Sequence, residues 1–314
     1  MVKFRNARYC NIKAIMIFLV IYGHMIEFNI DRSVFLMFQY RLIYFVHMPV
    51  FVFLSGVFVN SAFDCKKQLI KILPTYILLQ IVMVIIGNGN VKLFTPYWHL
   101  WYLLSLCIWL AIGWIGFELL NRRKLVFILL AIVVGCVSGY VLCIGRMFSL
   151  SRTIVFFPYF LAGMFFKSNF EWEKYKCWAV ILFLCCNIVM LLFYNIIPTE
   201  FLYHAVAFGD IMNGALLRLV CYFIGGIAIL FFLSVLPDRR CFFTKFGVNT
   251  MPAYIIHAAI ISALRKTGFF FQFSLPLTVI IMYTIYMIFL WTSKLYGIKA
   301  MKGGKPIDIF SASL

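Results

Sequence analysis

Long, unbroken apolar runs cover most of this 314-residue chain and constrain its fold more than any other feature. A transmembrane helix needs about 20 consecutive, mainly apolar residues. Backbone groups in lipid must also find partners within the protein, which leaves helices or closed barrels. A membrane barrel would show short segments of alternating polarity instead. With 65% hydrophobic and 12% charged residues, the chain is predicted to be an all-α integral membrane protein.

The apolar runs predict a bundle of about ten transmembrane helices within a single domain, residues 1–314. Short cytoplasmic tails are expected at 1–10 and 297–314, and no linker or additional soluble domain is visible. The predicted spans lie near residues 12–28, 34–59, 69–87, 98–118, 125–145, 153–167, 177–197, 214–235, 249–264 and 275–295.

The charge distribution predicts the orientation of these spans. The net charge is +18, and 20 of the 28 Lys and Arg residues fall in alternate segments that share one side of the membrane. The positive-inside rule assigns that side, with both termini, to the cytoplasm. The basic excess is therefore interpreted as a topology signal rather than as a nucleic-acid-binding surface. The first apolar run is long and lacks a small-residue cleavage site, so it is expected to remain as a span.

The first span carries an ionisable pattern that indicates chemistry. His24 lies eleven residues after Lys13, so the two share one helix face and are separated by about 16 Å along the axis. Glu27 follows His24 at i+3, where its carboxylate would orient the imidazole and raise its basicity. Ionisable groups within a bilayer are costly and usually functional. The alternative is a His–Glu pair that lies at the membrane interface without a catalytic role.

Three more ionisable residues are expected inside later spans. Arg41 requires an anion, which is either Glu27 or Asp31 in a structural ion pair or a substrate group. His47 and His257 each lie in the middle of a span. A lone buried histidine usually bonds a carbonyl or hydroxyl group and serves the fold, whereas two that face one bundle interior would indicate a site.

Aromatic and basic residues open two of the predicted spans at the outer surface. Trp98, His99 and Trp101 begin the fourth span, where they would form an interfacial belt or stack on a sugar ring. Arg152 opens the sixth span and would hold a phosphate or pyrophosphate group or anchor the helix at the interface. His204 lies in the longest outer loop, which is expected to be solvated.

No metal is expected, because no Cys and His spacing resembles a zinc site. The chain also has no phosphate-binding glycine loop and no serine nucleophile elbow.

Several motifs resemble those of acyltransferase-3 membrane proteins, in the same order and over nearly the whole chain. The family opens with a basic residue, ten intervening residues and a histidine, which here are Lys13 and His24. Residues 45–56, with the sequence FVHMPVFVFLSG, resemble the second motif, and segments 98–104, 149–152 and 247–257 resemble later ones. The lysine in the first motif and the His-Met-Pro sequence of the second are most similar to the branch named for fucose 4-O-acetylase.

This resemblance implies a multi-pass enzyme of the bacterial cytoplasmic membrane. It would transfer acetyl from acetyl-CoA, as co-substrate, to a sugar hydroxyl of a capsular polysaccharide, an exopolysaccharide or a lipid-linked precursor. The family's usual arginine is Lys13 here, which keeps the charge but loses bidentate phosphate recognition. The usual acidic residue three positions earlier is Cys10.

His24 is predicted either to deprotonate the sugar hydroxyl or to accept the acetyl group transiently, and both routes stay open. The predicted site residues fall into three groups: catalytic His24, Glu27 and His47; donor-binding Lys13 and Arg152; and substrate-binding Arg41, Trp98, His99, Trp101 and His257.

Two other functions compete with this interpretation. A transporter or flippase for a polar or lipid-linked sugar would use the histidines as proton relays. Inverted repeats would favour it, and no convincing internal repeat is visible. An O-acyltransferase that acts on peptidoglycan is the closer alternative.

Overall fold

A computed structural model describes residues 7–86, 91–166, 171–192, 199–208 and 213–268. Within these ranges the chain is entirely helical and contains no β-strand. The α-helices are α1 (Ala7–Ile26), α2 (Val34–Val57), α3 (Ala62–Ile86), α4 (Trp101–Arg122), α5 (Lys124–Val137), α6 (Leu150–Met164), α7 (Lys176–Leu192), α8 (Thr199–Leu202), α9 (Gly214–Val235), α10 (Thr244–Val248) and α11 (Met251–Lys266). Short 3-10 helices are η1 (Glu27–Arg32), η2 (Trp98–Leu100), η3 (Ser138–Tyr140), η4 (Met147–Ser149) and η5 (Trp172–Tyr175).

The helical, multi-pass character of the chain is confirmed. In the described ranges, seven helical segments are long and apolar enough to cross a membrane, and α5 belongs to a shorter apolar helix, Lys124–Tyr140. The predicted tenth span, 275–295, and the predicted tail, 297–314, lie outside the described residues, as does most of the amino-terminal tail. The total of ten spans and the cytoplasmic location of both termini stay predictions.

The chain divides into two compact units. Unit 1 comprises Met1–Phe51, Glu171–Tyr194 and Ile227–Ser311. Unit 2 comprises Val52–Phe170, Asn195–Gly226 and Ala312–Leu314. Each unit therefore joins segments that are far apart in the sequence.

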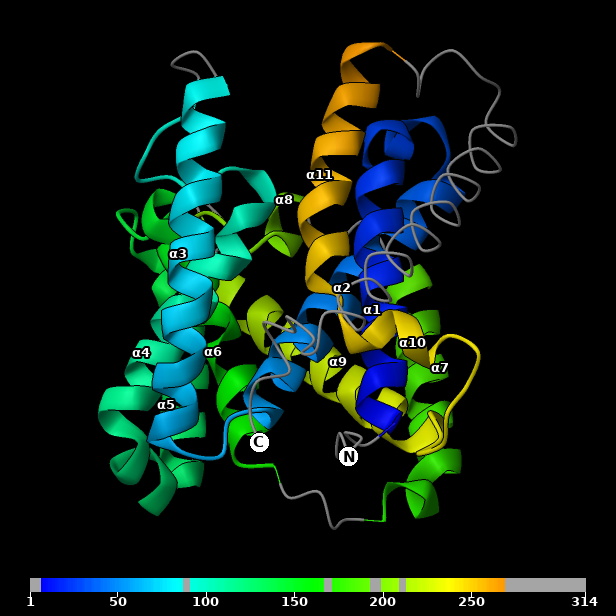
Figure 1. The fold of residues 1–314 in the computed structure, drawn as a ribbon. Coiled ribbons are helices and arrows are strands. Elements are labelled where there is room, and N and C mark those ends of the chain that lie inside the picture. The colour runs from blue at the N-terminus through cyan, green and yellow to red at the C-terminus, as the bar shows by residue number, and fades with distance from the viewer. Residues whose placement is uncertain (1–6, 87–90, 167–170, 193–198, 209–212, 269–314) are drawn as a thin grey trace. The chain divides into compact units, whose positions relative to one another are not determined.

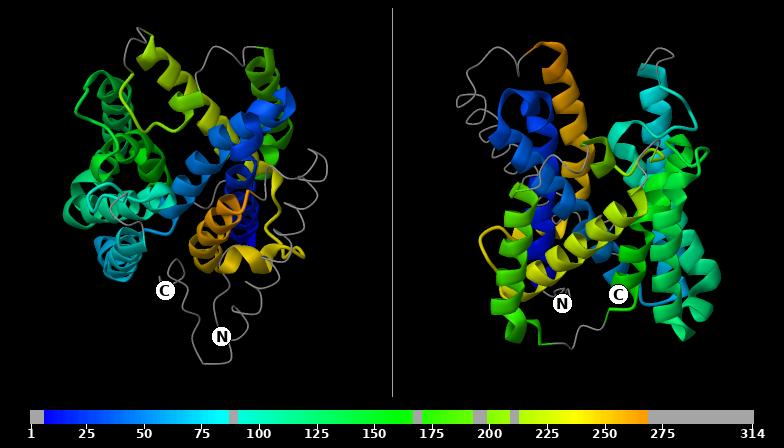
Figure 2. Two further views of the ribbon diagram at one scale, coloured as in Figure 1. Left: turned by 90° about the horizontal axis from the view of Figure 1, so that it is seen from above. Right: turned by 180° about the vertical axis from the view of Figure 1, so that it is seen from behind.

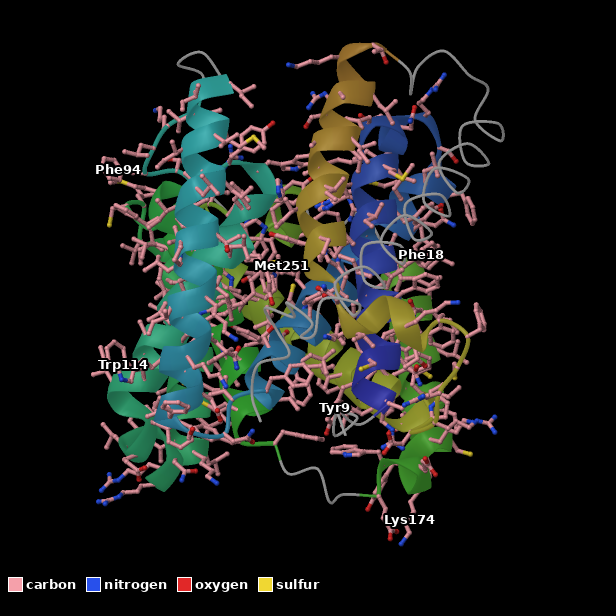
Figure 3. The ribbon with its side chains drawn as sticks, viewed as in Figure 1. Tyr9, Phe18, Phe94, Trp114, Lys174 and Met251 are labelled. Atoms are coloured by element: carbon pink, nitrogen blue, oxygen red, sulfur yellow. The ribbon has the colours of Figure 1, made fainter. Side chains whose placement is uncertain are left out.

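Unit 1 is built around α1, which packs against α10 and α11. Figure 1 shows α11 running beside α1, and Figure 3 marks Tyr9 near the start of α1 and Met251 at the start of α11. A β-carbon on Gly247 of α10 would lie only 1.7 Å from the Cys10 carbonyl oxygen. The two backbones thus meet directly, which only glycine permits.

The beginning of α1 is tied to the segment that precedes α10. Asn11 is fully buried, and its amide nitrogen donates to the carbonyls of Pro237 and Arg239, at 3.0 Å each. Its amide oxygen accepts a hydrogen bond from the Thr244 hydroxyl at 2.5 Å. These bonds explain why residues 7–11 are already helical although the span was predicted to begin near residue 12, since tertiary contacts satisfy the polar groups of these turns.

In unit 2, α3 packs along α4, and α5 packs along α6 (Figure 2). The end of α2 crosses α6 through two glycines. A β-carbon on Gly163 would lie 1.9 Å from the Phe53 carbonyl oxygen, and one on Gly56 would lie 2.1 Å from the Phe160 carbonyl oxygen. Small residues at a helix crossing allow close backbone approach, as is common between membrane helices.

The helices differ in how much apolar surface they leave uncovered. The most apolar stretches of α1 and α2 are 72% buried, whereas those of α3 and α7 are only 17% and 6% buried. Many apolar side chains are exposed. Trp114, which projects from α4 in Figure 3, is one of them and is 42% exposed. Such surfaces suit contact with lipid.

Candidate active site

The predicted pair at the end of α1 is present in the structure. Glu27 begins η1 directly after α1, and its Oε2 lies 3.2 Å from His24 Nδ1. The two side chains are 24% and 13% exposed, so the pair is mostly enclosed but reachable. A carboxylate can only accept a hydrogen bond from this nitrogen. In the neutral imidazole the contact therefore places the proton on Nδ1 and the lone pair of His24 on Nε2.

His257 from α11 stacks on His24. The ring centroids are 5.6 Å apart and the ring planes differ by 21°. His257 is 2% exposed, and its Nδ1 donates to the Ala253 carbonyl at 3.1 Å, one turn earlier on the same helix. The fold thus brings together two histidines separated by more than 200 residues, which spacing alone does not predict.

Tyr44 of α2 contacts both His24 and His47. Its hydroxyl is 3.5 Å from His24 Nδ1, and its ring meets that of His24 edge-on at 6.3 Å. The ring of His47, one turn later, meets Tyr44 edge-on at 5.0 Å. His47 is 3% exposed and its Nδ1 donates to the Ile43 carbonyl at 2.5 Å.

We define the histidine cluster as His24, Glu27, Tyr44, His47 and His257, all within unit 1. In each imidazole the Nδ1 partner is an acceptor, so all three rings share the tautomer with the proton on Nδ1. In the neutral form of each ring, Nε2 carries the lone pair. Only His24 combines this base with a carboxylate and with partial exposure, which suits it to remove a proton from a ligand hydroxyl.

Lys13 lies about three turns before His24 on α1 and is 3% exposed. Its Nζ donates to the Val248 carbonyl at 3.5 Å. The sequence placed this lysine at a membrane edge, and the structure instead encloses it where α10 ends. Nearby, Arg8 pairs with Glu173 at 2.7 Å and donates to the Leu236 carbonyl at 2.9 Å, which fixes the start of α1.

Arg41 is half-buried on α2, one turn before Tyr44. Glu27, which was one of the two acidic partners expected for Arg41, pairs with His24.

The remaining predicted site residues belong to unit 2. His99 is 3% exposed in η2, and its ring meets those of Tyr97 and Trp98 edge-on at 6.3 and 6.0 Å. Trp101 begins α4, and the guanidinium of Arg152 lies 4.8 Å from the centroid of its indole ring. These residues are therefore described apart from the histidine cluster.

Two buried basic residues of unit 2 were missed by the sequence interpretation. His204, expected in a solvated loop, is only 8% exposed, so that expectation was wrong for this residue. Arg218 of α9 is 1% exposed and had no role assigned. An arginine inside an apolar span is itself a signal of function. For Tyr44 the available signal was its i, i+3 spacing to His47.

Among the described residues, no group of three His, Cys, Asp or Glu side chains is placed to hold a metal ion.

Comparison with known protein families identifies the domain that contains the histidine cluster. Residues 9–293 match a family model described as an acyltransferase domain, the acyltransferase-3 model. This match includes every predicted site residue. Neither the curated proteins nor the solved structures include a chain with a significant match.

Proposed function

Because this chain belongs to the acyltransferase-3 family, we propose that it is an O-acetyltransferase with acetyl-CoA as donor and a saccharide hydroxyl as acceptor. The saccharide is a bacterial capsular polysaccharide, an exopolysaccharide or a lipid-linked precursor. The observation that carries the proposal is the partly exposed His24–Glu27 pair within the acyltransferase domain.

In the proposed reaction His24 is the general base. Its Nε2 takes the proton of the acceptor hydroxyl while the hydroxyl oxygen attacks the carbonyl carbon of the acetyl thioester. The carbon–sulfur bond then breaks, and the imidazolium returns the proton to the departing CoA thiolate. Glu27 holds the imidazole in the required tautomer and stabilises the imidazolium that forms between these steps.

The other members of the histidine cluster position His24. His257 stacks on one face of its ring, and Tyr44 contacts Nδ1 beside Glu27. His47 is buried and orients Tyr44 through their edge-on contact. A base held in this way loses little entropy when it reaches the reactive geometry.

Lys13 provides positive charge about 16 Å along α1 from His24. We assign it to the CoA phosphates, with the pantetheine arm extending along α1 toward the base. Lys13 is buried beside the Val248 carbonyl. The CoA phosphates must therefore displace this carbonyl contact or be attracted by the lysine charge without touching it. Lys13→Met should therefore raise the KM for acetyl-CoA more than it lowers kcat.

Acetyl transfer by the purified protein tests the proposal. The protein is reconstituted in nanodiscs with radiolabelled acetyl-CoA and saccharide extracted from the producing cells, and label in base-labile ester is counted. We expect transfer by wild type and by Phe18→Leu, a control on the same helix, and none above background by His24→Ala. Labelled protein trapped by denaturation without acceptor would instead identify His24 as an acetyl carrier. Saccharide movement across vesicles without acetylation would favour the transporter.

A further inference from the structure

A second cluster of ionisable residues, in unit 2, takes no part in the proton-transfer and acetyl-transfer steps described above. We define the arginine cluster as Ser149, Arg152, His204 and Arg218. Ser149 immediately precedes α6, Arg152 lies in the first turn of α6, and Arg218 lies on α9. The Ser151 hydroxyl donates to the His204 carbonyl at 2.7 Å, which ties His204 to the same turn of α6.

Both arginines contact neutral groups. Arg218 Nη1 donates to the Gly135 carbonyl at 2.7 Å and to the Ser138 hydroxyl at 3.2 Å. Its guanidinium carbon lies 4.4 Å from the centroid of the Phe208 ring. Arg152 Nε donates to the Tyr203 carbonyl at 2.9 Å, and its guanidinium lies over Trp101. Carbonyl, hydroxyl and ring contacts orient a guanidinium without neutralising its charge.

Aromatic rings connect the arginines to His204. The His204 ring meets those of Phe156 and Phe201 edge-on at 5.4 and 5.8 Å, and Phe201 is also 5.7 Å from the guanidinium of Arg218. Burial, together with the positive charges of Arg218 and Arg152, lowers the pKa of His204 to about 3. The imidazole of His204 is therefore neutral near pH 7.

Three buried polar atoms of this cluster have no hydrogen-bond partner among the described residues. They are the Oγ of Ser149, the Nδ1 of His204 and the Nε of Arg218. The residues are 3%, 8% and 1% exposed. Buried polar groups are normally satisfied, and a buried cation is costly without an anion. No carboxylate in the part of the chain that the structure describes forms an ion pair with Arg218.

The backbone conformation near Ser149 and His204 also indicates a binding site. Phe148, Ser149 and His204 have φ angles of 50°, 56° and 49°, in the left-handed region that residues other than glycine seldom adopt. Strain of this kind concentrates at binding sites. The 15-residue helix α6 also directs the positive end of its dipole toward Ser149.

We propose that the arginine cluster is a binding site for an oxyanion, the phosphate or carboxylate group of an acidic saccharide. Two guanidinium groups, a serine hydroxyl and an imidazole supply donors that suit such a group. The identification of this saccharide as the acetyl acceptor rests on the proposed function, whereas anion binding itself does not.

Equilibrium binding to the purified protein in nanodiscs tests the site. Radiolabelled inorganic pyrophosphate is the first probe, and unlabelled glucuronate and glucose are competitors. We expect saturable binding of one pyrophosphate per chain and no competition by glucose. Stronger binding of pyrophosphate than of glucuronate identifies a phosphate-bearing saccharide, and the reverse order identifies a uronate. Absence of saturable binding by wild type, at any pH from 6 to 8, would overturn the proposal.

Matched arginine variants locate the bound anion. Arg152→Gln should weaken pyrophosphate binding at least tenfold. Arg146→Gln removes the same charge from an exposed position six residues earlier and should change binding less than twofold. Because Arg152 is only half-buried, its replacement should leave the fold intact, as thermal unfolding would verify. Equal weakening by both variants would show that the anion senses only general surface charge and would contradict a built site.

Two further measurements distinguish anion binding by the arginine cluster from acetyl transfer and from donor binding. His24→Ala should abolish acetyl transfer and leave pyrophosphate binding unchanged, so failure of either proposal is recognised independently. Acetyl-CoA should not compete with pyrophosphate at its KM concentration. Stoichiometric competition, lost in Arg152→Gln, would assign the site to the donor phosphates and overturn the acceptor assignment.

Discussion

The histidine cluster and the arginine cluster surround their ionisable groups with different contact partners. In the histidine cluster, His24 has a carboxylate neighbour, and carbonyls fix the tautomers of His47 and His257. In the arginine cluster, Arg218 and Arg152 donate to carbonyls and a hydroxyl and lie against aromatic rings. The first arrangement favours proton transfer, and the second favours an incoming anion. Partner chemistry, more than the presence of charge, thus distinguishes the two.

The largest expected effect comes from removing the base. His24→Ala should lower the rate of acetyl transfer by about 10³-fold, within the range contributed by a positioned general base. Initial rates at saturating acetyl-CoA measure this loss. Phe18→Leu on the same helix should retain most of the activity, and an equal loss in both variants would point to damage to α1 rather than to lost chemistry.

Neutralising the carboxylate should have the second largest effect. Glu27→Gln preserves the shape and a hydrogen-bonding oxygen but cannot stabilise the imidazolium, so a kcat loss of about 10- to 100-fold is expected. Asp31→Asn, a matched loss of one carboxylate in the same 3-10 helix, serves as the control. If the two variants are equally active, the His24–Glu27 contact has no catalytic role.

Tyr44→Phe should have a smaller effect. The variant keeps the ring that contacts His24 and His47 and loses only the hydroxyl, which lies 3.5 Å from His24 Nδ1. A kcat decrease of about 3- to 10-fold is expected for a weak positioning bond, with an unchanged KM for acetyl-CoA. A change confined to KM would assign Tyr44 to substrate binding instead.

The smallest expected effect concerns stability and belongs to the arginine cluster. Burial and two arginines lower the pKa of His204 to about 3, whereas the unfolded chain has a value of about 6.5. Because the folded-state pKa is lowered, His204 does not reduce the free energy of unfolding above about pH 6.5. As the pH falls toward 3, protonation of the unfolded chain progressively lowers that free energy. The slope of this decrease approaches about 1.4 kcal/mol per pH unit.

His204→Gln should accordingly unfold with a weaker pH dependence than wild type. Thermal unfolding between pH 7.5 and 5, in buffer without polyvalent anions, measures the difference. Arg152 from α6 and Arg218 from α9 are the charged groups that act on His204. Parallel curves for the two proteins would show that His204 is protonated in the folded state or is not buried.

The sequence predicted helices well because apolar runs of membrane length leave the backbone few alternatives. Their ends were less predictable. Polar residues such as Arg8 and Asn11 resemble a tail in the sequence, but partners more than 150 residues away satisfy them within α1. Similarly, α3 begins at Ala62 rather than near residue 69, because a charged first turn still forms helix.

The candidate site was predicted where it depends on local geometry. The His24–Glu27 contact follows from i, i+3 spacing on one helix. The stacking of His257 on His24 depends on how α11 packs against α1, which no local pattern specifies. Arg218 and His204 were missed for the same reason, since their environment is created by residues from several separate segments.

Acetylation of the cell-surface polysaccharide tests the central claim most directly. A strain lacking the gene would be complemented with wild type, His24→Ala or an empty vector, after the membrane level of each protein is verified. Proton NMR of the purified polysaccharide, before and after mild base, would measure ester acetyl groups. We predict base-labile acetyl only with wild type. Equal acetylation in all three strains would contradict both the acetyltransferase assignment on this polysaccharide and the role of His24.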